Sequence, residues 1–253
     1  SSPLSVGNKT IPNRMVYQPM EGCDGTPDGR PGLLTRRRYA RYAAGGPGII
    51  WLEAVAVCPQ GRANPRQLWL HEETVADFQS LILSIKSICS VEHGFEPLVI
   101  LQLTHSGRYS KPEGKPAPLI AYNNPLFEPT PIDSSRILSD DQLKELEEAF
   151  GQVAKLAERA GADGVDIKCC HRYLLSELLS AYQREGTYGG SFENRTRLLR
   201  NAVEAAQAAT RSLLITTRLN LYDGFPYPYG FGVSADGGIQ PDYREGIALA
   251  RLL

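Results

Sequence analysis

Five short apolar segments alternate with longer segments of helical spacing, and this alternation constrains the fold more than any other feature of the chain. Short apolar runs bounded by turn residues are typical of buried strands, and apolar residues three and four positions apart are typical of amphipathic helices. Strands separated by helices build a parallel sheet with crossover connections, so the pattern predicts an α/β fold. Periodicity alone does not distinguish an open doubly wound sheet from a closed barrel. The expected strands cover residues 14–20, 49–54, 98–103, 165–168 and 213–219.

The segments between these strands carry signals for helices and turns. Ser139 and Gln142 have the spacing of a capping box, in which each side chain bonds the backbone N–H of the other residue, and they predict a helix start. Four arginines between residues 36 and 41 make the first helix basic, and we expect them on a solvated face. Residues 8–13 are typical of a hairpin. The expected helices cover residues 35–44, 72–93, 140–161, 193–209 and 242–253.

The 253 residues are enough for one domain with a sizeable core. No repeat and no second core pattern divides the chain, so we expect a single domain over residues 1–253. Residues 110–135 are rich in Pro and Asn and are too long for an ordinary connection, which predicts a functional loop or lid.

Charge and cysteine usage exclude several classes of function. The 27 basic and 28 acidic residues nearly balance, which gives no electrostatic basis for binding nucleic acid or an anionic membrane. No apolar run approaches the roughly 20 residues that span a bilayer. The five cysteines are an odd number without CxxC spacing, and no leader pattern is present. We therefore expect reduced thiols, a cytoplasmic protein and no metal site.

Proton-active side chains follow the expected strand 165–168. Lys168, His171 and Tyr173 supply a cation, a group that titrates near neutrality and a phenol that can donate a proton. The carboxyl ends of buried parallel strands are where α/β proteins place their chemistry. A solvated strand-to-helix turn is the alternative interpretation. No GxGxxG or GxxxxGK[ST] motif indicates a dinucleotide or P-loop domain.

Four stretches, taken in order, resemble the old yellow enzyme family of FMN-dependent NADH:flavin oxidoreductases. They read SPLSVGNKTIPNRMVYQPM, RRRYARYAAGGPGIIWLEAVAVCPQGR, ILQLTHSGR and GADGVDIKCCHRYLLSELLSAYQREGTYGGSFENRTR. The resemblance implies a TIM (β/α)8 barrel with FMN over the carboxyl ends of its strands. This chain would supply about the first five βα units and end before the last three strands.

The same resemblance implies which residues bind the cofactor. Pro19 and Met20 match the pair that approaches the flavin ring, and Ala54 matches a small residue whose backbone meets it. Gln102 matches the amide that bonds the flavin pyrimidine edge, and Arg218 matches the arginine beside that edge. A fixed cation there would stabilise the negative charge of reduced flavin.

The resemblance further implies an ene-reductase in which NADH or NADPH reduces FMN, and hydride from flavin N5 then reduces an activated C=C bond. His171 matches a group that holds the carbonyl oxygen of a small-molecule substrate, and Tyr173 matches the proton donor. Lys168 replaces the usual first His or Asn of the pair, and Arg172 replaces a usual Gly. These two cations predict a substrate with a negative group.

Three further interpretations stay open. A barrel without its later strands predicts a non-catalytic remnant or binding module that lacks FMN. Lys168 predicts a Schiff-base lyase if burial activates its amine. Cys23 lies near the position of a flavin-tuning thiol in some relatives, although in a different register. A homo-oligomer is also left open.

Overall fold

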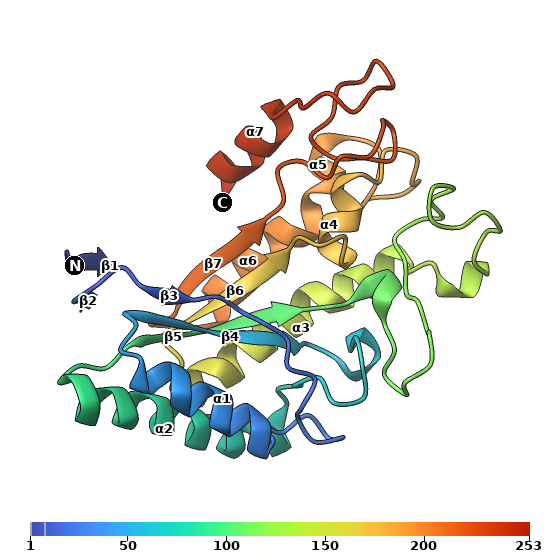
Figure 1. The fold of residues 1–253 in the computed structure, drawn as a ribbon. Helices are drawn as coiled ribbons and strands as arrows, with labels where there is room; N and C mark the ends of the chain where they lie inside the picture. Colours follow the sequence, from blue (N-terminus) through green and yellow to red (C-terminus); the bar gives the residue numbers. More distant parts are fainter. Residues whose placement is uncertain (1, 8) are drawn as a thin grey trace.

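The computed structural model describes residues 2–7 and 9–253 and contains a five-stranded parallel sheet (Figure 1). Its strands are adjacent in the order in which they occur along the chain, as successive βα units of a barrel require. A small antiparallel hairpin of β1 (Leu4–Val6) and β2 (Lys9–Ile11) precedes the sheet, and residue 8 of the predicted hairpin lies outside the described residues. The sheet strands are β3 (Val16–Tyr17), β4 (Ile49–Ala56), β5 (Leu98–Thr104), β6 (Gly164–Cys169) and β7 (Leu214–Leu219).

Four helices cover one face of this sheet (Figure 1). They are α1 (Leu33–Ala44), α2 (Val75–His93), α3 (Asp140–Arg159) and α6 (Arg197–Ala209). Val99, Leu101 and Leu103 of β5 point into the core beneath the helices, whereas Leu98 and Ile100 join a second apolar cluster on the opposite face. Shorter elements are α4 (Leu174–Leu179), α5 (Phe192–Arg195), α7 (Arg244–Leu252) and the 3-10 turns η1 (Pro59–Gly61), η2 (Glu72–Thr74), η3 (Gly107–Tyr109) and η4 (Ser134–Arg136).

The segment Glu72–His93 is long and apolar enough to cross a membrane by composition alone, with a mean hydropathy of 1.2. In the fold the apolar residues of one side of the helix face the core, whereas Leu83 and Val91 are exposed. Phe78, Leu81, Ile82 and Ile85 are no more than 1% exposed. The segment is therefore accounted for as the core helix of a globular domain.

Most predicted elements are confirmed to within a few residues, including the capping box of Ser139 and Gln142 at the start of α3. The first strand is much shorter than the predicted 14–20, and Pro19, which has no N–H, could not extend its ladder. The predicted helix 193–209 is divided into α5 and α6, which join at Thr196, and Ser191 caps the first part. The six-residue helix α4 was not predicted because it is too short to show a period.

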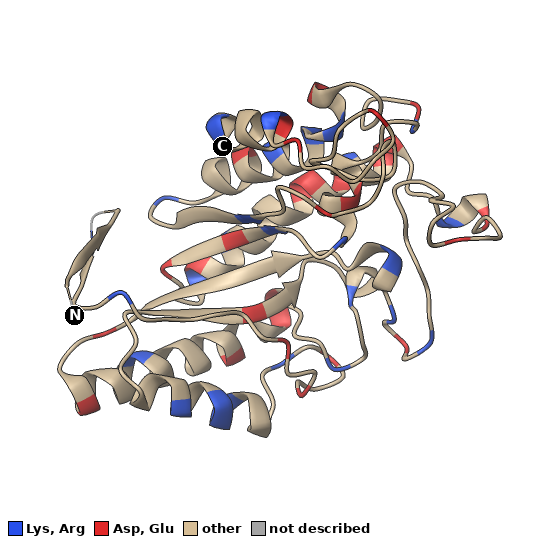
Figure 2. Cartoon of the chain, turned by 45° about the horizontal axis from the view of Figure 1, so that its top comes forward, with Lys and Arg blue, Asp and Glu red and all other residues tan. Residues whose placement is uncertain are grey.

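The expectation of a solvated arginine face on α1 is wrong for Arg38. Its guanidinium is 2.6 Å from Asp24 Oδ2 and also pairs with the carboxylate of Glu53, whose side chain is 2% exposed. The Tyr39 hydroxyl accepts the backbone N–H of Glu53 at 2.7 Å. A buried carboxylate needs a counter-charge, and the turn of α1 that faces β4 supplies it. Basic and acidic residues are otherwise interspersed over the helices and loops (Figure 2).

The long segment after β5 has no helix or strand between η3 and η4 and is held by buried ionic contacts. Arg108 Nε donates to Glu177 Oε2 at 2.7 Å, and the other oxygen of this fully buried carboxylate accepts the N–H of Ala121 at 2.7 Å. Arg108 also pairs with Glu128 of the segment. Burial raises the pKa of Glu177, and the charge of Arg108 opposes that shift.

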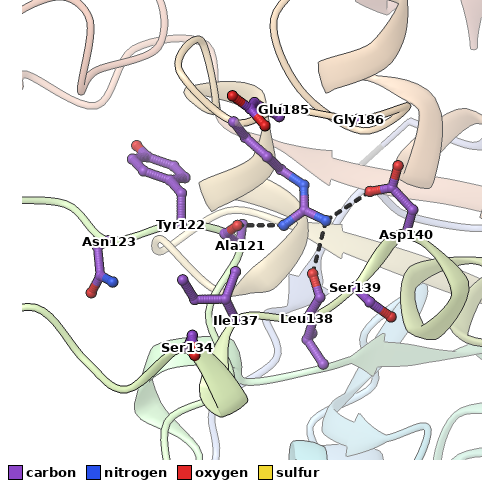
Figure 3. Close-up of a pocket in the computed structure, with 11 residues that line it drawn as sticks. Ala121, Tyr122, Asn123, Ser134, Ile137, Leu138, Ser139, Asp140, Glu185 and Gly186 are labelled. Carbon is purple, nitrogen blue, oxygen red and sulfur yellow. Dashed lines mark hydrogen bonds and ion pairs between the residues drawn. The ribbon is translucent and has the colours of Figure 1, made fainter.

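A hollow of about 580 Å³ lies at the end of this segment (Figure 3). Arg184 lines it and donates to the carbonyl oxygens of Ala121 and Leu138 at 2.5 and 2.8 Å, and to Asp140 Oδ1 at 2.8 Å. None of the predicted site residues lines the hollow. The hydrogen bonds of Arg184 therefore hold the end of the long segment in place. The role of residues 110–135 as a lid stays a prediction.

Candidate active site

Three side chains meet at the carboxyl end of β6 in one hydrogen-bonded group. Lys168 Nζ and the Tyr173 hydroxyl both donate to Glu21 Oε1, at 3.1 and 3.2 Å. The Lys168 ammonium also lies 4.0 Å from the centroid of the Tyr173 ring. The Lys168 side chain is only 3% exposed, whereas that of Glu21 is 21% exposed. The group therefore combines a buried cation with a carboxylate and a phenol at the sheet edge.

The backbone between Lys168 and Tyr173 adopts an uncommon conformation. His171 and Arg172 have φ angles of 60° and 54°, in the left-handed region. This conformation costs a residue with a Cβ roughly 1–2 kcal/mol relative to the right-handed region. The turn ends at Tyr173, which precedes the first residue of α4. Glycine, which has no Cβ, would adopt the φ angle of Arg172 without this cost.

Gln102 and Asp166 lie opposite each other on β5 and β6 and form a buried polar pair. Gln102 Nε2 donates to Asp166 Oδ2 at 2.7 Å, and Trp51 Nε1 donates to the same oxygen at 3.1 Å. Since a carboxylate only accepts, the amide must turn its NH2 group toward Asp166 and its oxygen away. Burial raises the pKa of Asp166, and the bond from Gln102 opposes the shift.

Arg218 lies opposite Lys168 in the ladder between β6 and β7, and it is exposed. Partial burial lowers the pKa of His171, and the charges of Lys168 and Arg218 lower it further. A lowered pKa leaves the imidazole neutral at pH 7, with one ring N–H to donate. The rings of His171 and Tyr173 are 6.4 Å apart. The structure thus brings Gln102, Arg218, His171 and Tyr173 to one edge of the sheet.

The other predicted cofactor residues approach this edge from β3 and β4. Pro19 is buried and Met20 is 66% exposed, and both directly precede Glu21. Ala54 is buried at a register shift between β4 and β5, where bulges often accompany sites. Its carbonyl oxygen accepts a hydrogen bond from Gln67 Nε2 at 3.1 Å.

Arg172 is occupied by the protein itself. Its Nη1 donates to Asp223 Oδ2 at 2.7 Å, and its guanidinium lies 4.8 and 4.5 Å from the ring centroids of Phe127 and Phe225. Its side chain is 8% exposed. These contacts join the long segment to the loop after β7. They do not support the predicted role of Arg172 as a substrate ligand.

We expect Arg172→Lys to lower the free energy of unfolding by about 1–2 kcal/mol, because an ammonium loses the flat contact with two rings. The variant should not change the ratio of KM values for carboxylate-bearing and neutral substrates. Urea unfolding and steady-state kinetics would check both points. A rise in KM confined to the anionic substrate would show instead that Arg172 binds it.

The surroundings of Cys23 do not activate its thiol group. Burial raises its pKa, and the nearby charges of Glu21 and Glu53 raise it further. The Asn64 side-chain N–H group donates to its sulfur at 2.9 Å. A raised pKa lowers the thiolate fraction at pH 7, so the contacts do not favour a redox role.

Sequence reasoning missed Glu21 and Asp166. Glu21 follows Pro19–Met20 directly, and this adjacency was the available signal for its place at the edge. Asp166 is a carboxylate inside a buried apolar strand, which by itself signals a polar partner.

Comparison with known proteins places this arrangement in a family. A model of the NADH:flavin oxidoreductase / NADH oxidase family matches residues 2–228. The chain belongs to this family. NADPH dehydrogenases of Bacillus pumilus and Geobacillus sp. are 34% and 35% identical to it over 213 and 212 residues. Each match covers 81% of this chain and 58% of the relative, so the chain spans little more than half the length of these relatives.

Solved structures agree on the fold. The structure of a 2-naphthoyl-CoA reductase complex matches this chain with a TM-score of 0.81 at 21% identity. The match covers 99% of this chain and 38% of the reductase chain. Old Yellow Enzyme from Pichia sp. has a TM-score of 0.78 at 21% identity, with 99% and 65% covered. The resemblance to old yellow enzyme is confirmed, and the five strands are part of a TIM barrel.

Proposed function

We propose that the protein is an FMN-dependent oxidoreductase that uses NADH or NADPH to reduce the C=C bond of an α,β-unsaturated carbonyl compound. The observation that carries this proposal is the meeting of Gln102, Arg218, His171 and Tyr173 at the carboxyl edge of the sheet, in a chain of the flavin oxidoreductase family. The relatives named NADPH dehydrogenase support a nicotinamide reductant.

The groups at the edge suit a flavin. The Gln102 amide, oriented by Asp166, offers its oxygen and one remaining N–H to a ring edge that alternates N–H and C=O groups. Arg218 adds an exposed guanidinium on β7, two strands away from Gln102 on β5, and its charge suits an electron-rich ring. Bound FMN would supply the hydride for the reaction. Its ring would be held by Pro19, Met20, Ala54, Gln102 and Arg218.

The chain's own residues would hold the substrate and provide the proton. Neutral His171 would donate a hydrogen bond to the carbonyl oxygen, which polarises the conjugated C=C bond. Tyr173 would give its phenolic proton to the α carbon. Both side chains belong to the turn after β6, so the carbonyl and the α carbon would be held at neighbouring points.

The ion pairs of Lys168 and Arg172 do not support the predicted anionic substrate. Lys168 pairs with Glu21 and Arg172 pairs with Asp223, so both cations already have carboxylate partners. A further negative group would lie beside Glu21 and be repelled by it. We therefore propose a neutral carbonyl compound. Among the described residues no contact favours the Schiff-base alternative, since Lys168 Nζ donates to Glu21.

The absorption spectrum of the purified full-length protein tests the proposal. We expect a yellow protein that bleaches when NADH or NADPH is added and recovers its colour with an enone. Arg218→Ala should weaken FMN binding about 10–100-fold, because charge-assisted hydrogen bonds contribute about 1.5–3 kcal/mol. Arg211→Ala, at an exposed arginine before β7, is the matched control. A folded, colourless protein would favour a barrel remnant without FMN.

A further inference from the structure

Glu21 is the one carboxylate whose oxygen joins both candidate proton carriers of the site, among the contacts of the described residues. The same atom, Oε1, accepts from Lys168 Nζ at 3.1 Å and from the Tyr173 hydroxyl at 3.2 Å. Glu21 comes from the segment after β3, whereas its two partners lie on either side of the turn after β6. Neither the family match nor any predicted role accounts for this contact.

The shared oxygen determines where the phenolic proton points. Because the Tyr173 hydroxyl donates to Glu21, its proton lies between two oxygens of the protein in the absence of a substrate. Loss of that proton would place a phenolate beside a carboxylate. Burial raises the pKa of Tyr173, and the charge of Glu21 raises it further. The phenol therefore keeps its proton at neutral pH until a strong base, such as a substrate carbanion, takes it.

Other groups face the phenol from each neighbouring element. Cys23 follows Glu21 on the same segment, and Tyr109 of η3 lies with its ring centroid 5.7 Å away. Lys168 and His171 face it from the end of β6. Lys168 is the one cation in contact with both Glu21 and the phenol ring among these described groups. It can stabilise negative charge on either oxygen.

We propose that Glu21 controls the proton on Tyr173: it orients the phenol through the shared oxygen and returns a proton to it after each proton donation. The orienting role stands on the geometry alone, and the returning role rests on the proposed function. Glu21 is thus a positioning residue that acts through Tyr173 and does not touch the reacting carbon.

The proton steps balance when an acid of the buffered solvent supplies one proton for each turnover. The O–H bond of Tyr173 breaks as a C–H bond forms at the α carbon, which leaves a phenolate. Glu21, whose side chain is 21% exposed, first takes a proton from a buffer acid in the solvent and then passes it to the phenolate. This transfer restores both the Glu21 carboxylate and the O–H bond of Tyr173. No electrons move in these steps.

A fluorinated tyrosine at position 173 tests the orienting role without flavin or activity. The fluorine lowers the phenol pKa into a range that the folded protein tolerates, and ¹⁹F NMR follows the titration in the full-length protein. We expect Glu21→Gln to lower the midpoint by about one pH unit, because it removes a neighbouring negative charge. Glu92→Gln, at an exposed carboxylate of α2, should leave the midpoint unchanged. An unchanged midpoint in Glu21→Gln overturns the orienting role.

Kinetics of the flavin-loaded protein test the returning role. Glu21→Gln should slow reoxidation by an enone about 10–100-fold and raise the solvent isotope effect on kcat, at the lower end of what acid–base catalysis contributes. Reduction by NADPH should stay unchanged, and Glu21→Asp should restore part of the rate. Wild-type rates and isotope effects in Glu21→Gln overturn this role. A protein that binds no flavin defeats the proposed function instead, while the titration still decides the orienting role.

Discussion

Tyr173→Phe should slow reduction of an enone by about 10²–10⁴-fold, the usual contribution of a positioned general acid. Reduction of bound FMN by NADPH should keep its wild-type rate, since that half-reaction needs no proton from the phenol. The structural reason is the place of the hydroxyl. The hydroxyl lies at the carboxyl end of β6, next to Lys168 and Glu21. A Phe ring keeps the packing but has no phenolic proton to donate. Stopped-flow measurement of the two half-reactions separates the effects.

Tyr109→Phe is the matched control for this experiment. The ring centroids of Tyr109 and Tyr173 are 5.7 Å apart, and Tyr109 is 39% exposed. The variant therefore removes a hydroxyl group close to Tyr173. We expect less than a threefold change in either half-reaction, because Tyr109 is not placed to donate the proton. If Tyr173→Phe reduced enones as fast as the wild type, another group would have to be the proton donor.

Glu177→Ala should lower the free energy of unfolding by about 3–5 kcal/mol, the cost of removing one partner of a buried ion pair. The carboxylate is fully buried, and it satisfies both Arg108 Nε and the backbone N–H of Ala121. The variant leaves Arg108 with Glu128 as its remaining ionic partner in the described structure. Urea unfolding would measure the loss, and limited proteolysis within residues 110–135 would show whether the long segment comes loose.

Two further variants test how much of this loss is due to the charge of Glu177. Glu177→Gln keeps an oxygen for the Ala121 N–H but loses the charge and the acceptor for Arg108 Nε, so we expect a smaller loss, about 1–3 kcal/mol. Glu185→Ala removes an exposed carboxylate near the same segment and should cost less than about 0.5 kcal/mol. Equal stability of Glu177→Ala and the wild type would show that the ionic contacts do not hold the segment.

Local patterns in the sequence predicted the sheet and most of its helices. Val165 and Ile167 lie in a short segment that follows turn residues, which is typical of a buried strand, and Ser139 with Gln142 marked a helix start. The end of β6 could be recognised as the site because polar residues follow an apolar strand there. These features depend on residues close together in the chain, so the sequence alone was sufficient.

Contacts between distant segments needed the tertiary structure. Glu21 reaches Lys168 across 147 positions, and Arg172 reaches Asp223 across 51. The sequence therefore identified Lys168 and Arg172 as cations but left their partners unknown, and it predicted an anionic substrate that their pairing does not support. The charge of a side chain is set by its own chemistry, whereas its availability depends on which carboxylates the fold brings beside it.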